Sequence, residues 1–131
     1  QNLFICPSTI AQHAALACFE PESLAIYEQR RNEFKARRDY FIPQLNAMGL
    51  TVPVMPDGAF YAWADCSVAC AKLGVKDSWD FAFEVMNRVH VAVTPGRDFG
   101  TAQTQNFVRF STASSMEHLQ EAVARLRTLL L

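Results

Sequence analysis

Among the residues that could take part in chemistry, one arginine stands out. Arg109 lies within the segment NFVRFSTASS, residues 106–115, in an apolar run that is typical of a β-strand. Alternation along such a strand places Val108 and Phe110 on one face of a sheet and Arg109 on the other. A guanidinium held by a strand can bind a carboxylate through two parallel hydrogen bonds, because its planar donors match two oxygens. A simpler interpretation also fits: Arg109 lies on a solvated sheet face with its stem along its neighbours.

The cysteines, histidines and lysines indicate less. Cys66 and Cys70 could form half of a metal site, but no second cysteine or histidine pair completes it. We therefore expect no metal, and we interpret the four cysteines as scattered core thiols in a reducing compartment. Lys35, Lys72 and Lys76 have no neighbours in the sequence that would activate them as nucleophiles.

The composition is typical of one folded domain without a strong charge. Of the 131 residues, 50% are hydrophobic and 19% are charged, and the formal net charge is −1. Such a chain has no overall field that would attract nucleic acid or an anionic membrane, so we expect neither partner. The cysteine pattern, which indicates a reducing compartment, predicts a cytoplasmic location. The chain begins at Gln1 without a basic leader or an initiator methionine, so we expect it to be a piece of a longer protein.

Helical periodicity dominates the first part of the chain. Ser8 or Thr9 could cap a short helix, and Pro21 suits the first turn of a second, longer one. We expect this second helix to bend at Pro43 and to stop at Gly49. Its apolar positions form one stripe, which comprises Tyr27, Phe34, Phe41, Leu45 and Met48.

Short strand patterns and two further helices make up the rest. The strand patterns cover residues 50–54, 60–65, 91–93 and 107–112. A third helix begins after Asp77 or Ser78 and ends near His90, and a last helix begins at a capping box of Ser114 and Glu117. The order α-α-β-β-α-β-β-α predicts an α+β fold of two layers, with helices packed on a small, mainly antiparallel sheet.

Three motifs in a fixed order carry a family resemblance. They are PDGAFYAW at 56–63, TPGRDFG at 94–100 and FVRFS at 107–111, and an amphipathic terminal helix follows them. Together with the segments STIAQHAA and RRDYFIPQLNAMGL, they resemble the C-terminal small domain of class I and II aminotransferases, the fold-type I pyridoxal-phosphate enzymes. The resemblance extends from about Ser8 onward. It therefore identifies residues 1–131 as a single domain, the C-terminal small-domain fragment of a larger aminotransferase.

The resemblance implies a role for Arg109. In that family, the arginine of the matching strand motif receives the α-carboxylate of the amino-acid substrate. The intact enzyme would then move an amino group between an amino acid and a 2-oxo acid with pyridoxal 5'-phosphate, as a homodimer whose large domain binds the cofactor. No segment here resembles the lysine-bearing cofactor site of the family, so we expect the fragment to be inactive alone and to bind no cofactor covalently.

The loop before the arginine strand carries expectations of its own. In the motif TPGRDFG, the resemblance implies that Gly96 and Gly100 permit unusual backbone dihedrals and that Phe99 packs inward. Arg97 and Asp98 are expected to be solvated.

Other functions remain open at this stage. A C–S lyase, or another eliminating enzyme of the same fold, would bind the substrate carboxylate through the same arginine. A freestanding α+β module for ligand binding or regulation would instead use Arg109 to hold an acidic effector without any reaction, and a purely structural surface for assembly is a third alternative. The sequence does not identify the amino-acid substrate.

Overall fold

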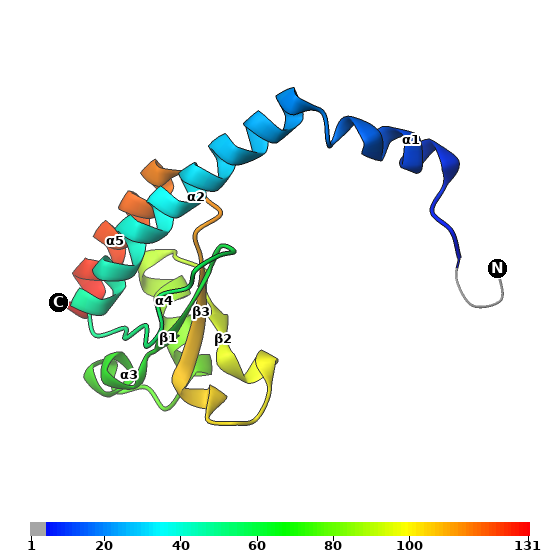
Figure 1. The fold of residues 1–131 in the computed structure, drawn as a ribbon. Coiled ribbons are helices and arrows are strands. Elements are labelled where there is room, and N and C mark those ends of the chain that lie inside the picture. Colours follow the sequence, from blue (N-terminus) through cyan, green and yellow to red (C-terminus); the bar gives the residue numbers. More distant parts are fainter. Residues whose placement is uncertain (1–4) are drawn as a thin grey trace. The chain divides into compact units, whose positions relative to one another are not determined.

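The computed structural model describes residues 5–131, and its ribbon is shown in Figure 1. The chain divides into two compact units whose boundary lies between Glu33 and Phe34, within helix α2. Within residues 5–131, no helix has both the length and the apolar character that crossing a bilayer requires.

The first unit consists of helix α1 (Thr9–Ala17) and the beginning of helix α2 (Pro21–Ala47). Ser8 occupies the N-cap position of α1, as expected, although its side chain makes no capping hydrogen bond. Pro21 is the first residue of α2, where its missing N–H costs no helical hydrogen bond. Helix α1 buries none of its residues within this chain, so its apolar side chains are exposed.

The remainder of α2 enters the core of the second unit. Phe41, Ile42 and Leu45 are buried, and Pro43 lies inside the helix, which continues to Ala47. Gly49 follows with a φ of +80°, and the Leu50 N–H donates to the Leu45 carbonyl over 3.1 Å. This left-handed glycine ends the helix, as the sequence predicted.

Three short strands form one antiparallel sheet in the order β1-β3-β2. Their bounds are β1 (Tyr61–Asp65), β2 (Thr94–Pro95) and β3 (Phe107–Ser111). Strand β3 is central: Arg109 pairs with Trp63 of β1 on one side and with Thr94 of β2 on the other. The predicted α+β fold with a small antiparallel sheet is confirmed.

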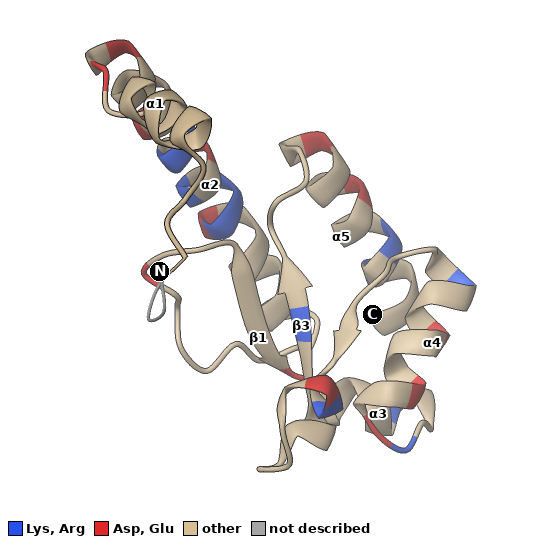
Figure 2. Cartoon of the chain, turned by 90° about the vertical axis from the view of Figure 1, so that its right-hand side faces the viewer, with Lys and Arg blue, Asp and Glu red and all other residues tan. Residues whose placement is uncertain are grey.

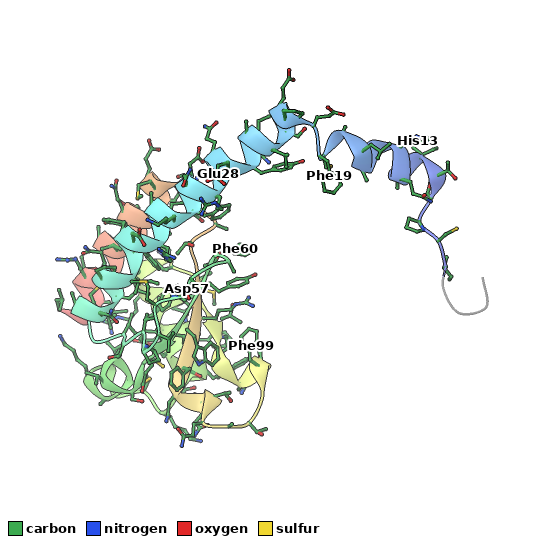
Figure 3. All side chains as sticks on the ribbon, viewed as in Figure 1. His13, Phe19, Glu28, Asp57, Phe60 and Phe99 are labelled. Carbon is green, nitrogen blue, oxygen red and sulfur yellow. The ribbon has the colours of Figure 1, made fainter. Side chains whose placement is uncertain are left out.

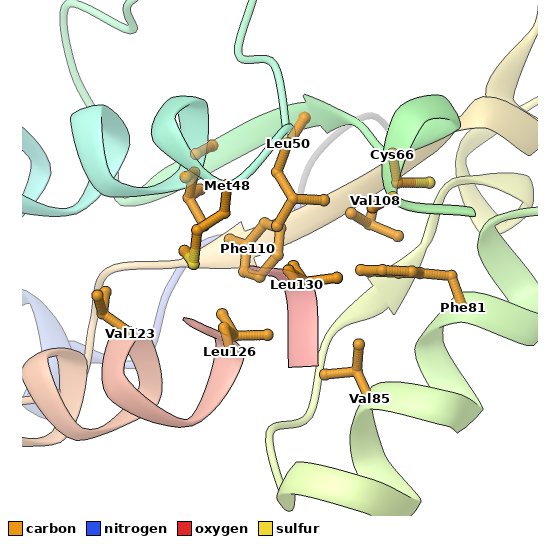
Figure 4. Close-up of a cluster of buried hydrophobic side chains, with 14 of the residues drawn as sticks. Met48, Leu50, Cys66, Phe81, Val85, Val108, Phe110, Val123, Leu126 and Leu130 are labelled. Atoms are coloured by element: carbon orange, nitrogen blue, oxygen red, sulfur yellow. The ribbon is translucent and has the colours of Figure 1, made fainter. Parts of the chain in front are cut away.

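One face of this sheet packs against the helices and forms the core (Figure 4). Ala62, Ala64, Val108 and Phe110 are the inward-facing strand residues, and each is at most 3% exposed. Helices α4 (Ser78–Val89) and α5 (Met116–Leu130) cover them. The main helical side chains of this cluster are Phe41, Leu45, Phe81, Val85, Leu119, Val123, Leu126 and Leu130. Burying each large apolar side chain contributes about 1.5–3 kcal/mol, so this layer fixes how the strands are placed.

The helix starts agree with the sequence at one site and differ at another. Asp77 caps α4, and its carboxylate accepts hydrogen bonds from the N–H groups of Trp79 and Asp80 at 2.9 and 3.2 Å. The capping box predicted at Ser114 is wrong by one residue. Ser115 is the N-cap of α5, and its hydroxyl accepts from the His118 N–H at 3.3 Å.

Two of the predicted strands are not formed as expected. Residues 50–54 make only an isolated bridge between Thr51 and Asp65, because Pro53 has no N–H with which to extend a ladder. At 91–93, Val91 and Val93 pack against the core without strand pairing, and β2 begins only at Thr94. Their apolar pattern indicated burial rather than a strand.

Helix α3 (Ser67–Leu73) was not predicted; Cys66 is its N-cap residue, and Cys70 lies within it. Cys66 and Cys70 are buried with their sulfur atoms 3.7 Å apart, and the Cys66 thiol donates to the Asn106 carbonyl over 3.1 Å. The hydrogen bond with Cys70 and burial raise the pKa of the Cys66 thiol well above its usual value. Cys6 and Cys18 are exposed, so the prediction of four core thiols is correct for only two.

Candidate substrate-binding site

The sheet face opposite the core is largely aromatic. Tyr61 and Trp63 project from β1 on this face, and Phe107 and Arg109 project from β3, because their neighbours in each strand point into the core. The Trp63 and Phe107 rings are stacked, with their centroids 5.4 Å apart and an angle of 4° between their planes. The Arg109 side chain therefore lies among aromatic rings rather than on a solvated face of the sheet.

Arg109 contacts two of these aromatic side chains. It is half-buried and is the one charged residue of β3, visible as the blue segment of that strand in Figure 2. Its guanidinium carbon lies 4.1 Å from the centroid of the Tyr61 ring and 4.6 Å from that of the Phe99 ring. Both distances are within the range of a cation–π interaction. Its Nη2 also donates to the Thr94 hydroxyl at 3.5 Å, which is a long and weak hydrogen bond.

The hydrogen-bonding capacity of this guanidinium is mostly unused. Across residues 5–131, Arg109 makes no ion pair, and the contact with Thr94 is its one side-chain hydrogen bond. A guanidinium has five N–H donors along its edges, whereas a cation–π contact occupies only its flat face. The arrangement thus presents a positive charge and free donors on a rigid strand, which suits a planar carboxylate ligand.

Phe99 reaches Arg109 from the loop between β2 and β3, where it is labelled in Figure 3. This loop contains two short 3-10 helices, Gly96–Phe99 and Thr104–Asn106. The Phe99 ring also meets the Trp63 ring edge-on, with centroids 5.5 Å apart. The expectation that Phe99 packs inward is wrong: the residue is 46% exposed, and it lies over the aromatic face rather than in the core.

Two glycines fix the shape of this loop in different ways. A Cβ atom added to Gly96 would lie 2.2 Å from the Thr104 carbonyl oxygen and 2.5 Å from that of Phe107. Gly96 is therefore required for close approach, and its φ is not in the left-handed region. Gly100 has a φ of +133°, which confirms the unusual dihedral expected there.

Arg97 stabilises the same loop from its other side. Arg97 and Asp98 are exposed, as expected. The Arg97 guanidinium carbon nevertheless lies 3.1 Å from the centroid of the Trp79 ring on α4, so Arg97 is stacked rather than simply solvated. This contact ties the start of the loop to a core helix.

The other residue types that could hold a cofactor or metal do not gather at Arg109. Lys35 lies 3.5 Å from the Asp39 carboxylate, and Lys72 donates to the Leu130 carbonyl at 2.6 Å. Lys76 lies in the exposed segment between α3 and α4. In the described part of the chain, no three His, Cys, Asp or Glu residues are grouped to bind a metal ion. Among the described residues, the cationic group at this site is thus the Arg109 guanidinium.

The chain forms an α+β domain in which helices pack on one face of a three-stranded antiparallel sheet. An arginine on the other face of the central strand suits this domain to carboxylate binding. Comparison with known proteins gives the family. The chain belongs to the class I and II aminotransferases, because the family model for aminotransferase class I and II matches residues 1–126. The family predicted from the three motifs is confirmed, and enzymes of this family generally depend on pyridoxal phosphate.

Individual relatives show the extent of the likeness. The chain is 33% identical over 125 residues to valine–pyruvate aminotransferase of Mycobacterium tuberculosis, which covers 95% of this chain and 31% of the relative. It is also 33% identical over 120 residues to an aspartate aminotransferase of Bacillus sp. strain YM-2, covering 92% and 30%. The crystal structure of an aminotransferase from Mycobacterium tuberculosis matches with a TM-score of 0.85 and 33% identity, covering 98% of this chain and 32% of that one. The chain thus spans about a third of the length of these relatives.

Proposed function

We propose that this chain is the C-terminal small domain of a pyridoxal-phosphate-dependent aminotransferase, and that Arg109 binds the α-carboxylate of its amino-acid and 2-oxo-acid substrates. One observation carries the proposal: a half-buried guanidinium on the central strand has no acidic partner among the described residues and keeps most of its donors free. Membership of the aminotransferase family supports it. So does the length of the chain, which is about a third of that of its relatives.

In this proposal the chain contributes binding and orientation. Pyridoxal phosphate, when bound, supplies the aldehyde and the electron-withdrawing ring with which the amino group is exchanged. Arg109 holds the two carboxylate oxygens, which fixes the direction of the remaining bonds at the substrate α-carbon. The strand limits movement of the arginine, and the Tyr61 and Phe99 rings contact its guanidinium. The amine that meets the cofactor would belong to the larger part of the enzyme, which this chain does not span.

The partners of the chain follow from the same proposal. A large cofactor-binding domain of the same polypeptide and a second identical subunit would cover apolar side chains that are exposed here. The first unit alone exposes Ile5, Ile10, Leu16 and Phe19, each by more than 60%. A cytoplasmic location fits the exposed free thiols of Cys6 and Cys18.

The alternative functions have less support. A freestanding binding module would not explain the match of nearly the whole chain to an enzyme family. The relatives described above are aminotransferases, and none of their names indicates a C–S lyase.

The test uses the full-length protein from which this chain comes. We expect it to show the visible absorbance of bound pyridoxal phosphate, and we expect that absorbance to change with some members of a panel of amino acids. Arg109→Lys keeps the charge but loses the planar fork, so kcat/KM for amino acids should fall severely. Arg125→Lys is the matched control, because Arg125 lies on α5 and pairs with Glu121. Kinetics that are unchanged in Arg109→Lys would contradict the assignment.

A further inference from the structure

We propose that Tyr61 and Phe99 are positioning residues that hold the Arg109 guanidinium so that its N–H edge faces the substrate carboxylate. This inference rests on the proposed function of Arg109 and names the groups that set its orientation. The two rings lie 4.1 and 4.6 Å from the guanidinium carbon. A cation–π contact of this kind leaves the N–H groups at the guanidinium edge available to a ligand.

Little else in the described residues restrains this side chain. An arginine has several rotatable bonds and loses considerable rotamer entropy when it is held in one position. The single polar contact of the Arg109 side chain is the 3.5 Å hydrogen bond to Thr94, which is too long to fix an orientation by itself. The aromatic contacts are therefore the main interactions that orient the guanidinium before a substrate binds.

Core packing does not account for these two rings. Tyr61 is 40% exposed and Phe99 is 46% exposed, and neither belongs to the buried cluster. Each ring also meets one other ring: Tyr61 meets Phe60, with centroids 4.5 Å apart, and Phe99 meets Trp63 at 5.5 Å. Tyr61 and Phe99 thus leave much of their surface to solvent while each contacts the guanidinium.

The rings come from two independently fixed elements. Tyr61 begins β1 and pairs with Ser111, two residues beyond Arg109 on β3, so the sheet register places it. Phe99 ends the first 3-10 helix of the loop, where the close approach at Gly96 and the edge contact with Trp63 place it. The position of the guanidinium therefore depends on both the sheet and the loop. Moving either element would change the orientation of the guanidinium.

The experiment measures steady-state kinetics of the intact enzyme for an amino acid and a 2-oxo acid. Tyr61→Leu and Phe99→Leu should each raise KM for both substrates about 3- to 30-fold, the size of a cation–π contact, with a smaller change in kcat. Tyr61→Phe and Phe99→Tyr keep the ring face and should leave KM within about twofold of the parent value. Tyr27→Leu is the matched control, because Tyr27 is an exposed aromatic residue of α2 that is not one of the rings in contact with Arg109.

A double substitution separates positioning from general damage. In an Arg109→Leu background, adding Phe99→Leu should change KM by less than about twofold, because the ring then has no guanidinium to hold. An equal rise of KM in both backgrounds would overturn the inference. If Arg109→Leu raises KM but neither leucine variant does, the inference fails and the proposed function stands. If Arg109→Leu itself leaves KM unchanged, the proposed function fails.

A second measurement avoids the risk that a leucine variant does not fold. Fluorinated phenylalanine at position 99 keeps the ring shape while it weakens the negative charge on the ring face. KM should rise progressively with the number of fluorine atoms. A KM that is independent of fluorination would contradict a cation–π role for Phe99.

Discussion

Replacing Gly96 by alanine should destabilise the domain strongly, because there is no room for the added carbon. The new Cβ would lie 2.2 Å from the Thr104 carbonyl oxygen, 2.5 Å from the Phe107 carbonyl oxygen and 3.0 Å from the Trp63 ring. Carbon and oxygen atoms rarely approach closer than about 3.3 Å, so both carbonyls would have to retreat by about 1 Å. Phe107 begins the central strand and cannot retreat without weakening its pairing with Asp65. Overpacking of about 1–3 kcal/mol and the loss of one or two backbone hydrogen bonds, about 1 kcal/mol each, sum to about 2–5 kcal/mol.

Urea unfolding of the chain with and without the substitution measures this effect. With an m-value of about 1–3 kcal/mol/M, the midpoint should fall by roughly 1 M or more in Gly96→Ala. Gly58→Ala is the matched control, because an added Cβ there meets no atom within 4 Å and the φ of Gly58 is not in the left-handed region. Its stability should change by less than about 1 kcal/mol, in the stabilising direction if at all. Equal midpoints for the two alanine variants would refute the close-approach argument.

Three smaller predictions concern caps and thiols. Ser115→Ala should reduce the free energy of unfolding by about 1 kcal/mol because the α5 cap is lost, whereas Ser114→Ala should have almost no effect. Equal losses of stability for the two variants in urea unfolding would contradict the assignment of Ser115 as the cap. Asp77→Ala removes two capping hydrogen bonds from α4 and should cost about 1–2 kcal/mol, most of which Asp77→Asn restores, and a neutral Asp77→Ala would contradict this role. At pH 8, a thiol reagent should label the two exposed cysteines rapidly but Cys66 and Cys70 only after unfolding, because both thiols are buried; rapid labelling of all four would contradict the core packing.

Periodicity in the sequence predicted the elements that bury one regular face. The long α2 helix, α4 with its Asp77 cap, and the alternation of β3 around Arg109 all follow from such patterns. The failures occur where apolar residues are buried without regular pairing, as at Val91 and Val93. Helix α3 was missed because it is only seven residues long, too short for an amphipathic pattern to be recognised.

The site was only partly predictable for a related reason. The face on which Arg109 lies follows from alternation within its own strand. Its contacts with Tyr61 and Phe99 depend on the register between β1 and β3 and on the path of the loop, which are long-range features. Phe99 lies in a 3-10 segment where no simple period applies, and the inward orientation that the resemblance implied for it is wrong. In the PDGAFYAW turn, Ala59 adopts the left-handed region with a φ of +59°.

The most direct test of the account is a crystal structure of the intact enzyme with an unreactive carboxylate analogue of its substrate. We predict two N–H groups of Arg109 within about 2.7–2.9 Å of the two carboxylate oxygens. The Tyr61 and Phe99 rings should remain on the faces of the guanidinium, as they are in the chain alone. A carboxylate that is held by other residues, with Arg109 turned away from it, would contradict the central claim.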